Sequence, residues 1–454
     1  MLLNQMWLRL GEDLPVELEQ SRDEGRNVDV YEQEVRKIQD MDLNNPKREK
    51  LAHELYDKLQ ALPVTSDHTY NEPSELDEIW AARPDKRFGK KIPEFSEDEL
   101  YNRIYGAWLG RCAGCLLGMP IENWKRERIL GLLHDTDNHP INYYISSNID
   151  SALREKYDIH DQVPDDKYSY FKWINNVKHM PEDDDTNYTI IALKLIETYG
   201  HNFKPDDVAE CWLKSIPILH TCTAERVAYR NFANLVLPPL SAIHLNPYRE
   251  WIGAQIRADL YGYINPGDTK NAASMAWRDA SISHVKNGIY GSMATAAKIA
   301  AAFVTANPRE IILAAMGEIP EHSRLYECFD TVLNWHRDGV ASDDALNRIH
   351  QMYDENNPHQ WCHTNPNAMV VATAVLYGEM DLEKTIGLTI AAAFDTDCNA
   401  ATAGSIVGAA IGAIALPKKW IQPLNDTISS GVDGFGSIAI SELAHRTAAL
   451  VKSE

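Results

Sequence analysis

Basic residues are scarce in this chain. Its 454 residues include 44 lysines and arginines against 66 aspartates and glutamates, which gives a formal net charge of −22. Glutamates interrupt the two short basic runs, at 47–50 and 125–128. A surface of this charge repels a phosphate backbone. We therefore expect no nucleic-acid polymer among the partners of the protein.

Long apolar runs are also missing. Residues 292–306 and 400–416 come nearest to a membrane span, but the first contains Lys298 and the second is built mostly from Ala and Gly. A spanning helix needs about 20 strongly apolar residues. The first ten residues lack the long apolar core and the cleavage site of a signal peptide. We expect two buried helices in a cytoplasmic protein that has no membrane partner.

The cysteines are few, and their number and spacing do not suggest disulfide pairs. Seven of them are scattered along the chain, and neither an odd number nor this spacing suits a disulfide framework. Cys112 and Cys115 form a C-x-x-C sequence, but no second pair is present to complete a zinc site. We interpret both as small residues of a buried core.

Patterns typical of β-strands are nearly absent, so the sequence predicts an all-α fold. Residues 142–145 are the one weak strand candidate, inside an irregular stretch at 134–170. Residues 1–97 are strongly charged and helical in pattern, and prolines mark a linker near 84–97. We predict an N-terminal helical cap or interaction segment at 1–97, through which an oligomer could form. One large catalytic domain is expected at 98–454.

Two series of glycines recur every fourth residue. The first is Gly106, Gly110, Gly114 and Gly118, and the second is Gly404, Gly408 and Gly412. On a helix each series makes a ridge without side chains, because residues four apart stack on one face. Each glycine costs about 1 kcal/mol relative to Ala in a helix interior. The repeated cost indicates that a close approach of two backbones matters at both ridges.

A run of carboxylates begins at residue 183. Asp183, Asp184 and Asp185 precede Thr186 and a stretch with helical apolar spacing, so they fall at a helix N-terminus. A helix cap needs one carboxylate, and three adjacent ones repel each other. A divalent cation with oxygen ligands would remove this repulsion. Capping and metal binding are both open interpretations of this run.

A second acidic sequence, Asp395-Thr396-Asp397, lies between two apolar stretches. Two ionised carboxylates in such surroundings are costly unless they are paired or bound to a metal. No Lys or Arg lies near them in the sequence. We expect an extended turn that points both side chains to one side, as chelation requires. Together the two runs offer five carboxylates, enough for two cations.

These features occur in the order that is typical of a known family. The first glycine series ends in Met119-Pro120-Ile121-Glu122, Asp184-Asp185-Thr186 follows, and Asp395-Thr396-Asp397 precedes Gly404 and Gly408. In this respect the chain resembles the ADP-ribosylglycohydrolases, the relatives of the dinitrogenase-reductase-activating glycohydrolase, over roughly residues 98–420. The resemblance implies a compact domain of many helices with two Mg2+ or Mn2+ ions in a cleft. It also implies metal-dependent release of ADP-ribose from a modified protein, nucleotide or small molecule.

The resemblance implies roles for the acidic residues. Asp184, Asp185, Asp395 and Asp397 would ligate the metals, with Glu122 as a mobile acidic residue beside them. The ions would bind the 2- and 3-hydroxyls of the ribose whose C1 bond is cut, and a carboxylate would accept a proton from the attacking water. Asp185 and Glu122 are both candidates for this base, and the sequence does not choose between them.

The chain departs from the family pattern at three positions near the metals. Asp183 stands where a Thr is usual, and Cys398 stands where the family commonly has a metal-ligating Thr. Cys115 follows Gly114 where an Asp is usual. We include Asp183 and Cys398 in the candidate metal shell. Because a thiol is a poor ligand for Mg2+, Mn2+ becomes the better candidate.

The resemblance also points to residues that would contact the substrate, each with an alternative interpretation. These residues are Arg257, His284, Gly291, Asn365 and Asn367. A histidine such as His284 is more often part of the core or surface, and the two asparagines can be turn or cap residues. Two other functions stay open: a two-metal hydrolase of another nucleoside or phosphoester, and a non-catalytic ADP-ribose-binding protein.

Overall fold

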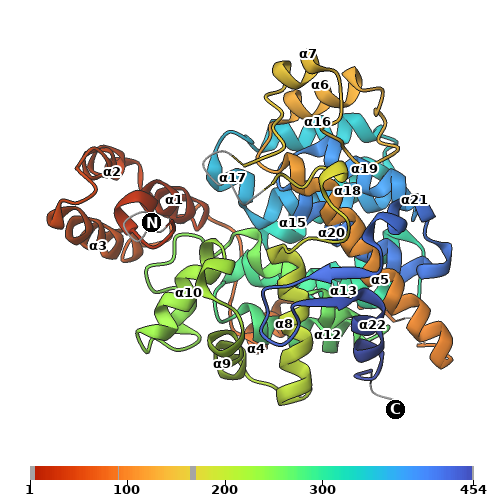
Figure 1. The fold of residues 1–454 in the computed structure, drawn as a ribbon. Helices are drawn as coiled ribbons and strands as arrows, with labels where there is room; N and C mark the ends of the chain where they lie inside the picture. Colours follow the sequence, from red (N-terminus) through yellow and green to blue (C-terminus); the bar gives the residue numbers. More distant parts are fainter. Residues whose placement is uncertain (1–5, 90–91, 164–169, 452–454) are drawn as a thin grey trace.

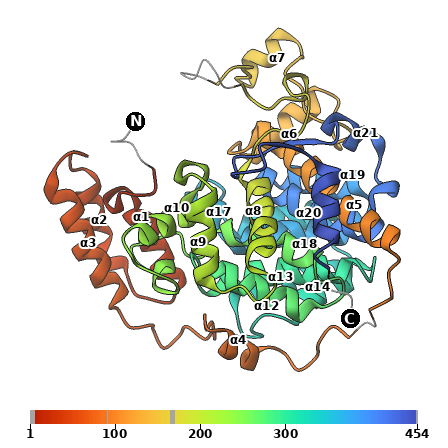
Figure 2. The ribbon, with the colours of Figure 1, turned by 60° about the horizontal axis from the view of Figure 1, so that its bottom comes forward.

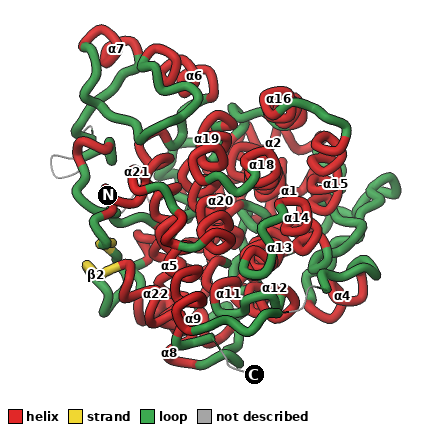
Figure 3. Tube along the Cα trace, turned by 90° about the vertical axis from the view of Figure 1, so that its right-hand side faces the viewer, coloured by secondary structure: helices red, strands yellow, loops and turns green. Residues whose placement is uncertain are grey.

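Helices make up nearly all of the regular structure, so the prediction of an all-α fold is confirmed. The computed structural model describes residues 6–89, 92–163 and 170–451. Within these ranges the α-helices are labelled α1 to α22, and a single two-stranded sheet lies at the edge of the molecule (Figure 1 and Figure 3). None of the helices in the described ranges is long and apolar enough to cross a membrane.

The first three helices pack against each other around a core of their own. They are α1 (Leu10–Asp23), α2 (Glu32–Gln39) and α3 (Pro46–Gln60), drawn in red in Figure 1. Helix α3 begins after Asn45, whose side chain accepts a hydrogen bond from the Lys47 amide at 3.0 Å and so caps the helix. The separate core consists of Leu10, Leu14, Leu18, Val28, Val35, Ile38, Ala52, Leu55, Tyr56 and Leu59.

Residues 63–96 connect these helices to the rest of the chain. Helix α4 (Leu76–Ala82) packs on the large core through Ile79, which is fully buried. Residues 90–91 of the predicted linker lie outside the described residues, as do residues 1–5 of the N-terminal segment. Helix α5 (Glu97–Gly118) then begins with Ser96 as its cap. The division of the chain at residue 97 stays a prediction.

The remaining helices share one large core. They are α6 (Arg126–Asp135), α7 (Ser151–Lys156), α8 (Asp184–Tyr199), α9 (Pro205–Ser215), α10 (Thr223–Ala233), α11 (Asp259–Tyr263), α12 (Thr269–Ala280), α13 (Lys286–Ala302), α14 (Pro308–Met316), α15 (Arg324–Arg337), α16 (Ser342–Met352), α17 (Pro358–Cys362), α18 (Thr364–Gly378), α19 (Leu382–Ala392), α20 (Thr396–Ile411), α21 (Lys418–Ile421) and α22 (Ile440–Ala448). Figure 3 shows α13, α18 and α20 in the middle of this arrangement. The greater part of each stretch considered as a membrane span falls in a buried helix, residues 292–302 in α13 and residues 400–411 in α20, whereas Ile414 after α20 is exposed.

Short elements complete the structure. The 3-10 helices are η2 (Asp29–Tyr31), η3 (Met119–Ile121), η4 (Ile174–Asn176), η5 (Ile218–His220), η6 (Leu240–Ala242), η7 (Ile252–Arg257), η8 (Ala413–Ala415) and η9 (Gln422–Leu424). Strands β1 (Thr427–Ser429) and β2 (Ser437–Ala439) pair antiparallel, with Ile428 opposite Ile438.

The expected strand at 142–145 is wrong. This stretch has no regular secondary structure. Its apolar residues Tyr144 and Ile145 pack into the core instead of forming a strand. The Tyr144 hydroxyl donates a hydrogen bond to the Trp420 carbonyl at 2.6 Å. Residues 164–169 of the predicted irregular stretch lie outside the described part of the chain.

The two glycine series face each other in the contact between α5 and α20. A Cβ atom added to Gly106, Gly110 or Gly114 would lie less than 3.0 Å from backbone atoms of Gly408, Gly404 or Ala400, respectively. A Cβ on Gly118 would lie equally close to the amide nitrogen of Asp397. Hence only glycine allows the two helices to approach this closely. The contact joins the end of α5 to the beginning of α20, where the acidic residues are.

We predict that Gly110→Ala destabilises the protein strongly, because the added methyl group meets the backbone of α20 and cannot be absorbed by a side chain. The expected loss is at least about 3 kcal/mol in the free energy of unfolding. It can be measured as a lower midpoint in urea, followed by circular dichroism. Gly387→Ala in α19 is the matched control, because its nearest neighbour is a side-chain atom at 3.4 Å. Equal midpoints for both variants would contradict the role of the ridge.

Candidate metal centre and cleft

Both acidic runs lie at helix N-termini. Asp183 caps α8, and its side chain accepts a hydrogen bond from the Asp185 amide at 3.0 Å. Asp395 occupies the cap position of α20, so Asp397 lies in the first helical turn rather than in the extended turn that the sequence suggested. The Thr396 hydroxyl donates to the Gly118 carbonyl at 3.1 Å, which ties the start of α20 to the end of α5. The partial positive charge of each helix N-terminus favours these carboxylates.

The fold brings the two runs together. One group of possible metal ligands contains Cys115, Asp183, Asp185 and Asp397, and a second contains Asp395, Asp397 and Cys398. Within each group the ligand atoms all lie within 4.8 Å of one another. Asp397 belongs to both groups, so one carboxylate connects two potential ion sites.

Three carboxylate oxygens in these groups are buried without a hydrogen-bond partner among the described residues. They are Oδ2 of Asp185, Oδ1 of Asp395 and Oδ1 of Asp397, on side chains from residues that are 0%, 5% and 3% exposed. An unpaired buried carboxylate is costly, and a cation or a proton would offset this cost. These oxygens are therefore free to bind a metal ion.

Burial and mutual repulsion disfavour the ionised form of this cluster. Burial, followed by the charges of neighbouring carboxylates, raises the pKa of Asp183 and Asp395 well above the ordinary range. The same two causes raise the pKa of Asp184 to about 6. A bound cation would favour the ionised form of these carboxylates and so oppose the rise in their pKa.

Arg111 is a residue of the site that the sequence analysis missed. Its guanidinium is fully buried in α5 and donates to Oδ1 of Asp185 at 3.1 Å, while a second nitrogen lies 2.9 Å from Oδ1 of Asp259. Burial raises the pKa of Asp185, and the charge of Arg111 opposes that rise. Arg111 is the only charged residue in the glycine-rich stretch 106–118, and this was the available signal, since a buried guanidinium requires anionic partners.

Glu122 lies at the edge of the cluster. It follows η3 directly, its side chain is exposed, and it belongs to neither ligand group. The Asn123 side chain donates to it at 3.3 Å. The charge of Asp397, followed by burial in the cleft, raises the pKa of Glu122 well above its ordinary value. Glu122 is therefore an acidic side chain with access to solvent beside the buried carboxylates.

A cavity of about 460 Å³ opens over the cluster. Its size falls in the range of small-molecule sites, which is about 300–1,000 Å³. One part is acidic and the rest is largely apolar and aromatic. The lining residues are Met6, Trp7, Glu122, Asn123, Asp184, Tyr188, Cys222, Thr223, Glu225, Trp251, Ile252, Gly253, Ile256, Pro358, Trp361, Cys362, Asp395, Asp397 and Cys398. We call this cavity the cleft.

The residues predicted to contact substrate do not line the cleft. Arg257 is buried behind it, where the guanidinium pairs with Glu225 at 2.5 Å and with Asp279. His284 is fully buried, and its Nδ1 lies 2.8 Å from the Ser283 hydroxyl. Arg257 therefore acts on the cleft only through Glu225, which does line it.

The other three predicted substrate residues are also placed elsewhere. Gly291 packs against Thr364, and Asn365 lines a separate cavity. Asn367 supports the site from behind, since its side-chain oxygen accepts hydrogen bonds from the Asp395 amide at 3.2 Å and from Asn399 at 2.7 Å. Asn367 thereby fixes the turn that presents Asp395.

Most of the chain matches the model of a known protein family. The model of a family described as ADP-ribosylglycohydrolase matches residues 96–453. No curated protein matches the chain. Among solved structures, the chain is similar to one titled "ADP-ribosylglycohydrolase-related protein complex", with 16% identity over 78% of this chain and 98% of that one, and a TM-score of 0.44. Because the family match spans every helix that carries an acidic run, the chain belongs to the ADP-ribosylglycohydrolase family, a family of glycohydrolases.

Proposed function

We propose that the protein is a metal-dependent hydrolase that cleaves the bond at C1 of a ribose. It would release ADP-ribose from a modified protein, nucleotide or small molecule. The observation that carries this proposal is the meeting of the two acidic runs in two ligand groups that share Asp397. The unpartnered oxygens of Asp185, Asp395 and Asp397 support it, because they offer buried anionic ligands to a cation.

The residues fit two divalent cations. Asp183, Asp185 and Asp397 would hold one ion, and Asp395 and Asp397 would hold the other, with Asp184 beside them on the cleft wall. When bound, such ions supply Lewis acidity, orient hydroxyl groups and lower the pKa of a water molecule. Arg111 keeps one oxygen of Asp185 in place, so that the free oxygen faces a fixed direction.

Glu122 is the better candidate for the general base. Asp185 is fully buried, and Arg111 binds one of its oxygens, so its side chain is held in place. Glu122 is exposed within the cleft and can take a proton from water and pass it to solvent. The carboxylates of the site also stabilise the positive charge that develops at the ribose C1 in an oxocarbenium-like transition state.

We expect Asp397→Asn to abolish both metal binding and ADP-ribose release, because Asp397 belongs to both ligand groups. Glu122→Gln should keep metal binding and lower kcat by at least about 100-fold, the scale of a lost general base. Release is followed by chromatography with Mn2+ present, and metal binding by calorimetry. Asp344→Asn, an exposed carboxylate on α16, is the control and should behave as wild type.

Two results would contradict this function. Release of inorganic phosphate in place of ADP-ribose would show a phosphoesterase. Tight binding of ADP-ribose without turnover under any divalent metal would show a binding protein.

We also expect the metal-free protein to bind Mn2+ at least about tenfold more tightly than Mg2+, because Cys115 and Cys398 each stand within one ligand group. Cys398→Thr should narrow the difference by strengthening Mg2+ binding. Calorimetric titration of protein stripped with a chelator measures both. Cys211→Ala removes a buried thiol outside both groups and is the matched control. An unchanged Mg2+ affinity in Cys398→Thr would show that the thiol does not face the metals.

A further inference from the structure

The segment before the family match reaches the cleft. The match begins at residue 96, yet Met6 and Trp7 line the cleft together with Glu122 and Asp395. The Trp7 ring lies over the Arg226 guanidinium, whose carbon is 4.6 Å from the ring centre. This is the geometry of a cation–π contact. Trp7 also has a φ of 64°, in the left-handed region that bulky residues rarely adopt, so its surroundings hold it in place.

Buried ion pairs fix the N-terminal helices to the catalytic part of the chain. The Arg249 guanidinium contacts Glu17 at 2.7 Å and Glu24 at 2.8 Å, and all three side chains are at most 3% exposed. Both glutamates belong to α1 or the residue that ends it. Ion pairs buried this deeply are directional, so they set the position of α1 more narrowly than apolar contacts would. Figure 2 shows α1 beside α10 and close to α17.

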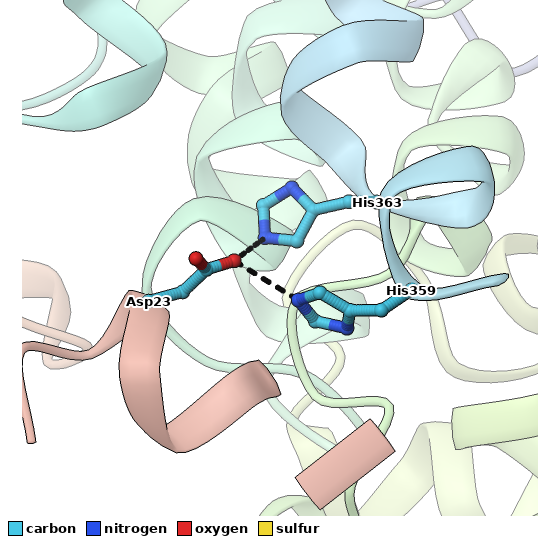
Figure 4. Close-up of side chains that lie close together, drawn as sticks. All are labelled: Asp23, His359 and His363. Atoms are coloured by element: carbon cyan, nitrogen blue, oxygen red, sulfur yellow. Dashed lines mark hydrogen bonds and ion pairs between the residues drawn. The ribbon is translucent and has the colours of Figure 1, made fainter. Parts of the chain in front are cut away.

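The end of α1 is held by His359 of α17, and His363 lies beside this contact (Figure 4). Oδ2 of Asp23 lies 2.9 Å from Nε2 of His359 and 3.8 Å from Nε2 of His363. The Trp251 indole N–H donates a hydrogen bond to Nδ1 of His359 at 3.0 Å. The backbone N–H of Asn365 donates a hydrogen bond to Nδ1 of His363 at 3.0 Å. A neutral imidazole carries one proton, so Nε2 is the protonated nitrogen in both rings.

In this group His359 donates its Nε2–H to the Asp23 carboxylate, while Nε2 of His363 lies near the same oxygen without a hydrogen bond among the described residues. The same three residues could in principle ligate a metal. A histidine that ligates a metal, however, normally donates its second N–H to an acceptor. In His359 and His363 the second nitrogen instead accepts a hydrogen bond. The tautomers therefore suit a hydrogen-bonded clamp, which we name the Asp23 clamp.

The Asp23 clamp connects the N-terminal segment to the aromatic part of the cleft. His359 belongs to α17, and Trp361 and Cys362 of this helix line the cleft. Trp251, which fixes the His359 tautomer, lines it as well. The position of Trp7 relative to Trp251 and Trp361 thus depends on how α1 is attached.

We propose that the N-terminal segment supplies one wall of the catalytic cleft and that Trp7 stacks on the adenine ring of the substrate. This proposal rests on the proposed function. The carboxylates of Glu122, Asp395 and Asp397 set the place of the reacting ribose. Trp7 lines the same cleft as Trp251 and Trp361. A flat base stacks well on an indole ring, and such stacking tolerates little displacement.

The test compares two substrates with the same aglycone. One is an ADP-ribosyl conjugate, and the other is a 5-phosphoribosyl conjugate that lacks the adenosine monophosphate half. Trp7→Ala should raise the KM of the ADP-ribosyl conjugate about tenfold, the scale of one lost base stack. The kcat for both conjugates and the KM of the truncated conjugate should stay within about twofold of the wild-type values, because the contacts to the reacting ribose are unchanged. Trp7→Phe should restore most of the lost affinity.

Asp23→Ala tests the clamp as a positioning element. It should give a selective rise in KM that is smaller than that of Trp7→Ala, because α1 loses its contact with α17 while the Arg249 ion pairs still hold it. Asp40→Asn, an exposed change on the same segment, is the control and should leave both substrates unaffected. An equal rise in KM for both substrates would mean that Trp7 only supports the fold. No change in either KM would mean that it does not contact the substrate.

Turnover by the wild-type protein tests the proposed function independently of Trp7. If the wild-type protein turns over neither conjugate with any metal, the hydrolase assignment fails. Calorimetry with ADP-ribose and with ribose 5-phosphate then tests the wall directly. Trp7→Ala should weaken the binding of ADP-ribose and leave the binding of ribose 5-phosphate unchanged. Equal affinity of the wild type and Trp7→Ala for ADP-ribose would overturn the inference.

Discussion

The backbone contact between α5 and α20 is the constraint on which the site depends. Glycines on α5 face Gly404 and Gly408 so closely that even one methyl group would strike the opposite backbone. This approach carries Gly118 to the amide of Asp397 and leaves Glu122 beside the start of α20. The aspartates stand at the N-termini of α8 and α20, and Arg111 of α5 pairs with Asp185 of α8. Their separation is therefore set by the packing of helices and not by a flexible loop.

The convergence of carboxylates creates an unbalanced charge that defines the chemistry of the site. Asp183, Asp185, Asp395 and Asp397 are brought together in largely buried positions, and Arg111 neutralises part of this charge from one side. Such an arrangement is costly for the folded protein alone. The cost is consistent with a site selected for binding cations and for stabilising a positively charged transition state, as expected in a glycohydrolase family.

The N-terminal segment gives this member of the family a cleft wall outside the family match. Its attachment uses buried ionic and hydrogen-bonded contacts, at Arg249 and at the Asp23 clamp, in addition to apolar packing. Directional contacts of this kind place Trp7 at a defined point over the cleft. The charged composition of residues 1–97, which marked them as a cap or interaction segment, is the source of these contacts.

The fold class, the two glycine ridges and the two acidic runs can all be predicted from the amino-acid sequence. Each of these depends on local spacing: helical periodicity, repeats of four residues, and carboxylates next to the start of a helix. Which distant side chains meet becomes visible only in the folded chain. Arg111 and Trp7 lie far in sequence from the aspartates that they accompany, whereas Arg257 and His284 are buried away from the cleft surface. The reason is physical, because the partner of a buried charge is chosen by the packing of whole helices and leaves no trace in the spacing of neighbouring residues.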